Sequence, residues 1–146
     1  MTMHTTKIAF TLHVEDGYPP ISVEHLNAKE FAPGQYEVLN SPFFIPEIAY
    51  GDIIDVNVGE NGRLEFKSCL KQSTFKALSI ILLDSKMDIL IMNLFGGKDC
   101  VIEYGEFGAM RMVAVGIPDS TNYAALQKEL DAYENAGMLS YAELVA

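Results

Sequence analysis

The sequence predicts an α+β protein with two halves. Residues 1–71 are expected to form a small, bent antiparallel sheet or partly open barrel, packed on a ferredoxin-like βαββαβ half over residues 72–146. In the first half, apolar residues alternate along short segments, which is the period of a half-buried strand. In the second, apolar runs alternate with helical patterns in the order strand, helix, strand, strand, helix, strand. At 146 residues and 49% hydrophobic content, the chain suits one domain or two very small ones packed rigidly on a shared core.

The first half is expected to consist of strands joined by tight turns. Ile8, Phe10, Leu12 and Val14 share one face of a strand over residues 7–14. Residues 22–26 predict at most a short helical turn or a second short strand. Further strands are expected over residues 35–39, 53–58 and 64–70, with a hairpin turn at residues 59–62.

Residues 40–55 form the most distinctive stretch. Pro42 and Pro46 exclude a helix here, yet the segment is too apolar to be a free loop. We therefore expect an ordered connector whose aromatic side chains fill the seam between the two halves. Asp52, which follows Gly51, is expected to accept backbone N–H bonds in a turn.

The second half is expected to begin with a strand over residues 73–83. A short helix over residues 87–95 follows, begun by a capping box at residues 85–88 and ended by Gly96-Gly97. Strands are then predicted over residues 100–103 and 110–117. A second helix carries Tyr123, Leu126, Leu130 and Tyr133 on one face and ends at Gly137, before a last strand over residues 139–145. Right-handed crossovers would place both helices on one face of the sheet.

Several motifs in the first half resemble a known pattern. They are Asp16-Gly17-Tyr18-Pro19-Pro20, Glu24-x-Leu26-x-Ala28, Gly34-x-Tyr36, Asn40-x-Pro42-Phe43-Phe44 and Ala49-Tyr50-Gly51-Asp52. Together they resemble an uncharacterised family of small bacterial proteins known only as a domain of unknown function. The second half resembles it in element order alone. Asn27 replaces an aromatic residue of that pattern, and Lys71-Gln72 replaces a Gly-His pair. The resemblance implies a bacterial source and no established chemistry.

Composition restricts the kind of partner and compartment. The net charge of −10 argues against nucleic-acid binding, which needs clustered Lys and Arg, and favours a basic partner. Cys69 and Cys100 lack Cys-x-x-Cys spacing, so we expect structural thiols in the cytoplasm. Charged residues interrupt the longest apolar region, residues 77–95, so no membrane span is predicted.

The sequence carries no recognisable catalytic set. The three histidines, His4, His13 and His25, all lie in the first 25 residues, and none follows to act as a base for a later Cys or Ser. A metal site formed by His13, His25 and Glu24 matches no common ligand spacing. We therefore expect a non-enzymatic protein without metal or cofactor, and an enzyme of unknown class is the third interpretation.

Two surfaces are candidates for binding a protein partner. One is a turn carrying Tyr104, Glu106 and Phe107, whose aromatic rings either stay exposed or fold back onto the sheet. The other is the outer side of the second helix, with Glu129, Asp131 and Glu134.

The leading interpretation is an acidic protein-binding module, of which one form is a bacterial immunity protein that neutralises a basic toxin domain. The alternative is a small-molecule-sensing or regulatory domain, which an analogy with ferredoxin-like folds suggests could pair as a homodimer. A pocket between the two halves, lined by the connector aromatics and open to solvent, would favour this alternative. A solid, dry junction would favour the protein-binding module.

Overall fold

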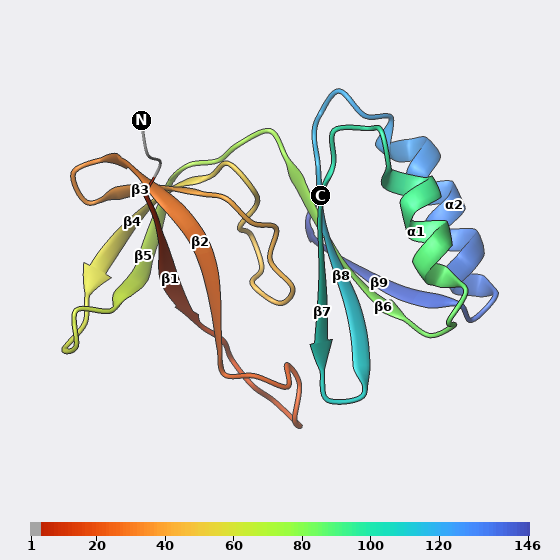
Figure 1. Ribbon diagram of the computed structural model, residues 1–146, viewed down its shortest axis with the longest axis horizontal. Helices are drawn as coiled ribbons and strands as arrows, with labels where there is room; N and C mark the ends of the chain where they lie inside the picture. Colours follow the sequence, from red (N-terminus) through yellow and green to blue (C-terminus); the bar gives the residue numbers. More distant parts are fainter. Residues whose placement is uncertain (1–3) are drawn as a thin grey trace.

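The computed structural model describes residues 4–146 and confirms the α+β class. The chain forms two sheets, a barrel followed by a four-stranded sheet, which lie side by side in Figure 1. Both helices cover the face of the second sheet that points away from the barrel. None of the helices within residues 4–146 has the length and apolarity needed to cross a membrane.

The N-terminal sheet is a closed barrel with the strand order β1-β2-β3-β4-β5. Its strands are β1 (Thr5–Thr11), β2 (Val23–Ala32), β3 (Gln35–Val38), β4 (Ile53–Val58) and β5 (Leu64–Lys71). Neighbouring strands pair antiparallel, but β1 and β5 close the barrel through a short parallel pairing of Ile8 with Leu64 and Ala9 with Glu65. The sequence predicted a bent sheet or a partly open barrel. Register shifts in the β2–β3 and β4–β5 pairs bend these strands, as β-bulges do, and favour closure.

Strand β2 is much longer than the short turn or strand expected at residues 22–26. Its buried positions are Glu24, Leu26 and Ala28, and they alternate with exposed ones. Glu24 carries a carboxylate and Ala28 only a methyl group, so these positions do not show the alternation of large apolar residues that predicts a strand. The strand period was therefore hidden in the sequence.

The barrel core contains eight buried residues: Ile8, Phe10, Leu26, Ala28, Val38, Ile45, Ile48 and Ile54.

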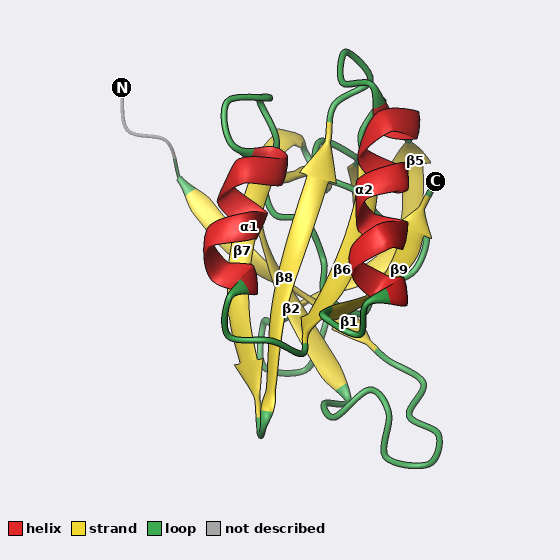
Figure 2. Cartoon of the chain, turned by 90° about the vertical axis from the view of Figure 1, so that its right-hand side faces the viewer, coloured by secondary structure: helices red, strands yellow, loops and turns green. Residues whose placement is uncertain are grey.

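The second sheet has the order β7-β8-β6-β9, with antiparallel neighbours throughout. Its elements are β6 (Lys76–Leu82), α1 (Met87–Phe95), β7 (Val101–Phe107), β8 (Met110–Ile117), α2 (Tyr123–Asn135) and β9 (Leu139–Val145). The predicted element order is confirmed. Figure 2 shows both helices in front of one sheet face, α1 nearer β7 and α2 nearer β9.

Helix α1 has the predicted bounds but not the predicted cap. Lys86 is the N-cap residue and makes no side-chain cap bond, so the capping box is wrong. Instead, Asp84 Oδ1 accepts a hydrogen bond from the Lys86 backbone N–H at 2.8 Å. Gly96 and Gly97 end the helix as expected, with a φ of 73° at Gly97.

Three small side chains lie on the other face of the second sheet. Leu78 and Ile80 of β6 belong to the core beneath the helices, so Ser79 between them faces the opposite way. On β8, Ala114 and Gly116 have the same orientation for the same reason, and all three are buried. Because small residues leave room, the connector lies directly on this face. The connector therefore forms the seam between the two sheets.

Candidate functional site

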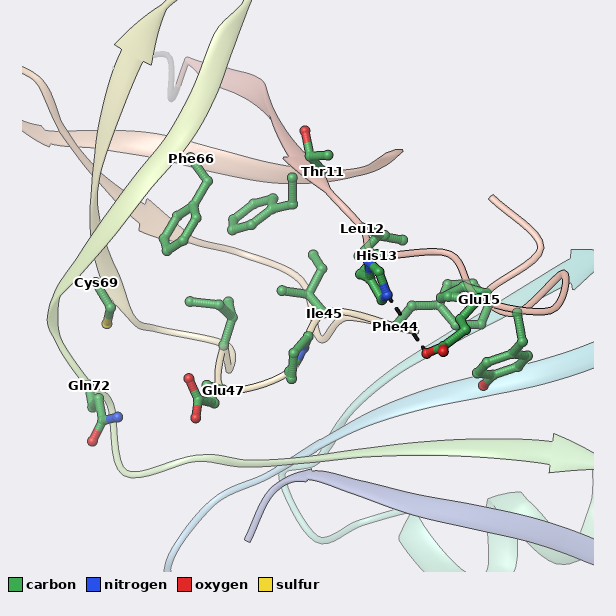
Figure 3. A pocket seen from close by; sticks show the side chains of 15 residues that line it. Thr11, Leu12, His13, Glu15, Phe44, Ile45, Glu47, Phe66, Cys69 and Gln72 are labelled. Atoms are coloured by element: carbon green, nitrogen blue, oxygen red, sulfur yellow. Dashed lines mark ion pairs between the residues drawn. The ribbon is translucent and has the colours of Figure 1, made fainter. Parts of the chain in front are cut away.

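A cavity of about 700 Å³ lies where the barrel meets the connector. Ten of its lining residues are labelled in Figure 3. Its apolar lining comes from β1, β5, the loop after β1 and the connector: Phe10, Leu12, Tyr18, Pro19, Phe44, Ile45, Pro46, Ile48 and Phe66. All lining residues precede Ser73. The cavity is therefore next to the seam and not inside it.

The aromatic walls of the cavity are held by ring contacts. Phe10 of β1 stacks on Phe66 of β5, with ring centroids 4.8 Å apart. Tyr18 meets Phe44 of the connector edge to face at 5.8 Å. Phe44, Ile45 and Ile48 are almost fully buried although they lie in an irregular segment. This wall is therefore preformed.

Polar groups lie at the two ends of the cavity. Figure 3 shows Glu47 and Gln72 at one end and His13 and Glu15 at the other. His13 Nε2 and Glu15 Oε2 are 3.7 Å apart, and both side chains are largely exposed. The body of the cavity is thus apolar, and its ends are acidic and exposed to solvent.

Cys69 belongs to the cavity wall and is a free thiol. Burial raises the pKa of this thiol, and the nearby Asp52 carboxylate raises it further. Burial also raises the pKa of Cys100. Because the thiolate is the nucleophilic form, both pKa shifts disfavour nucleophilic chemistry at neutral pH.

Two buried carboxylates fix the connector that forms one wall. Glu24 of β2 accepts hydrogen bonds from the backbone N–H groups of Phe43 at 2.7 Å and Phe44 at 2.9 Å. Asp52 accepts from Ala49 N at 3.0 Å and from Ser73 N at 2.7 Å, which confirms its predicted turn role. The wall is therefore tied to both the barrel and the start of the second sheet.

A second polar contact joins the two sheets through Asn40. Its side chain accepts from Asn27 N at 2.6 Å and donates to the Glu103 carboxylate of β7. Burial raises the pKa of Glu103, and it raises the pKa of Glu24 more than backbone hydrogen bonds lower it. Neither Glu103 nor this role of Glu24 was predicted from the sequence. A single carboxylate in a strand does not indicate, from the sequence alone, which distant segment it will bind.

The predicted turn surface is only partly exposed. Tyr104 is 53% exposed and Glu106 is also exposed. Phe107 instead packs edge to face on Phe43 at 5.2 Å and on Phe44 at 4.9 Å. Of the two alternatives predicted for its ring, Phe107 therefore shows the second, since the ring folds back and packs at the seam.

The predicted acidic surface of α2 is used partly within the chain. Asp131 accepts from the Tyr141 hydroxyl at 2.5 Å, and Glu134 accepts from the Tyr141 N–H at 3.0 Å. Glu129 is exposed. Since β7 and β9 are opposite edges of the sheet, the two predicted surfaces do not come together. Within residues 4–146, no three His, Cys, Asp or Glu side chains gather in a way that could hold a metal ion.

Comparison with known proteins places the chain in a family. The model of a family described as "Domain of unknown function (DUF4265)" matches residues 24–141, from β2 into β9. The chain belongs to this family. The match includes the connector, most of the barrel and nearly all of the second sheet.

The fold is shared with a solved structure. A crystal structure described as a hypothetical protein from Neisseria gonorrhoeae matches with a TM-score of 0.80 and 23% sequence identity. The match covers 99% of this chain and 97% of that one. This likeness concerns the fold. No curated protein matches the chain.

Proposed function

We propose that this protein is a non-enzymatic binding protein that takes a small, largely apolar molecule into the cavity beside the connector. One observation carries the proposal: the cavity measures about 700 Å³ and has an apolar body with polar ends. Small-molecule sites typically measure about 300–1,000 Å³ and combine apolar walls with a few polar groups. The raised pKa of Cys69 disfavours a nucleophilic thiolate in the wall and so supports binding without catalysis.

The position of the cavity supports a sensing role. Phe44 lines the cavity and also packs on Phe107 of the second sheet. Glu47, at one end of the cavity, donates its backbone N–H to Leu144 O of β9 at 3.0 Å. A ligand that contacts this wall therefore touches the segment that joins the two sheets.

The two free thiols provide a direct test of the cavity. Cys69 lines the cavity, whereas Cys100 does not and serves as an internal control. The neutral dye N-phenyl-1-naphthylamine should fluoresce in the presence of the protein. It should also slow alkylation of Cys69, read by peptide mass spectrometry, without slowing that of Cys100. Equal alkylation rates with and without bound dye would contradict the proposal.

A matched pair of substitutions locates the dye. Leu12→Trp places a large ring in the cavity wall and should abolish dye binding. Val58→Trp is the control, because Val58 is a strand residue of the barrel that is 72% exposed. Loss of binding in both variants, or in neither, would place the dye elsewhere.

A second candidate is the binding of a basic protein, as an immunity protein binds its toxin. The net charge of −10 and an apolar surface on α1 support it. Ile89 is 73% exposed and Met92 is 53% exposed, one helical turn apart. Replacing both by Lys should leave the fold intact and prevent capture of a basic partner. Capture that is unchanged would exclude this surface.

Two finer features complete the proposal. We infer that the C-terminal half is ferredoxin-like, which its βαββαβ order, its strand order and its two helices on one face support. We also infer a cytoplasmic location, supported by two free thiols.

A further inference from the structure

We propose that the ligand of this cavity is an organic cation, an amine or quaternary ammonium group attached to an apolar body. This inference rests on the proposed function and adds the chemical class of the ligand. It comes from the charges around the cavity, from the aromatic lining, and from the position of Glu47.

The charged groups of the lining favour a cation. Among its fifteen residues, Glu15 and Glu47 are the carboxylates, His13 is the one side chain that can become positive, and there is no Lys or Arg. Within the described chain, the Glu15 carboxylate has one ion pair, with His13. An anionic ligand would find no fixed positive charge here, whereas an ammonium group would find a carboxylate at either end.

Glu47 is held at its end of the cavity by an uncommon backbone conformation. Its φ is 68°, in the left-handed region that residues with a Cβ rarely adopt. The bond from its N–H to Leu144 O fixes this conformation against β9. Its carboxylate makes no hydrogen bond or ion pair with another residue of the described part of the chain. The carboxylate is therefore available to a ligand.

The aromatic lining is also suited to a cation with an apolar body. Phe10, Phe44, Phe66 and Tyr18 all contribute to the cavity. The faces of aromatic rings attract ammonium groups and accept apolar chains equally well. The net charge of −10 adds a long-range attraction for cations at low salt.

The test uses three dansyl probes that differ only in the end of a pentyl chain. One ends in a methyl group, one in an amine (dansylcadaverine), and one in a carboxylate. Because the two carboxylates lie at opposite ends, the ammonium group of a bound probe meets one of them at a time. One exposed carboxylate that contributes about threefold predicts binding of the amine about threefold tighter than that of the neutral probe. The carboxylate probe should bind more weakly than either. Raising the salt concentration to about 0.5 M should reduce the difference between the probes.

Charge-neutralising substitutions assign the preference to the cavity. Glu47→Gln and Glu15→Gln should each reduce the preference for the amine in part, because the other end keeps its carboxylate, and together they should remove it. Neither should change the affinity of the neutral probe. Glu60→Gln, on an exposed turn outside the cavity, is the matched control and should leave all three affinities unchanged.

The outcomes separate this inference from the proposed function. If the neutral probe binds and protects Cys69 but the amine binds no more tightly, the ligand is not a cation and the cavity remains a binding site. If the amine preference survives in the double variant, the cation lies elsewhere and the inference is wrong. If no probe binds, both the inference and the proposed function fail.

Discussion

The ring of Phe43 occupies the space that a side chain at residue 105 would need. A Cβ atom built on Gly105 would lie 2.8 Å from Phe43 Cζ. Glycine at this position of β7 thus allows the connector to lie directly on the second sheet. The seam depends on this close approach as much as on apolar contacts.

Gly105→Ala should destabilise the protein by about 1–3 kcal/mol, because the added methyl group has to displace the Phe43 ring. Gly116→Ala, on the neighbouring strand β8, is the control, since its Cβ would make ordinary contacts at 3.5 Å. Urea unfolding followed by circular dichroism measures both. Equal stability of the two variants would show that Phe43 can move at little cost.

Phe44→Ala should lower the free energy of unfolding by about 3–5 kcal/mol, because this ring is 6% exposed and packs on Phe107 and Tyr18. Phe31→Ala removes the same ring from a position that is 63% exposed, and should change the stability little. If Phe44→Ala keeps the native melting temperature but loses a ligand, the ring serves binding and not the seam.

Asp52→Asn should cost about 1–3 kcal/mol, because an amide has one acceptor oxygen for the two backbone donors, Ala49 N and Ser73 N. Asp55→Asn is the matched control. Asp55 is partly exposed and pairs with Lys67 at 3.8 Å, so its change should cost at most about 1 kcal/mol. Thermal unfolding compares the two, and a larger loss in Asp55→Asn would contradict the role given to Asp52.

Glu103→Gln should reduce the dependence of stability on pH. Burial raises the folded-state pKa of Glu103 above its ordinary value of 4.5, so the folded state holds this proton more tightly than the unfolded state. Its contribution is therefore most favourable below pH 4.5 and is lost as pH rises through the raised pKa. The Gln variant should lack this loss.

The measurement is the urea midpoint at a series of pH values, taken as the difference between variant and native protein. Glu106→Gln, which removes a carboxylate from an exposed position on the same strand, is the control. A constant difference for Glu103→Gln would mean that Glu103 titrates alike in both states.

Local patterns predicted most of the fold. The bounds of α1 follow from its apolar run and Gly96-Gly97. Helix α2 ends at Asn135, and Gly137, with φ 74°, follows it as the expected stop. The closed barrel and the length of β2 were not predicted, because both depend on what the strands meet in space. Nothing in the sequence around Leu64 indicates that this residue pairs with Ile8 of β1.

The candidate site was predictable only in part. The apolar connector indicated an ordered wall, and its aromatic residues do lie at the seam and the cavity. The other wall comes from β1 and β5, which meet only through the barrel, so no single stretch of sequence shows the cavity. Phe107 could not be placed because its burial depends on Phe43 and Phe44, far away in the sequence.

The bond between Glu47 N and Leu144 O has a consequence for the order in which the chain folds during synthesis. All barrel strands have left the ribosome long before β9 is made, so the barrel can close first. The connector then receives its support from β9 only when that strand pairs with β6. A nascent chain therefore lacks this one support of the cavity wall until β9 has been made and has paired with β6.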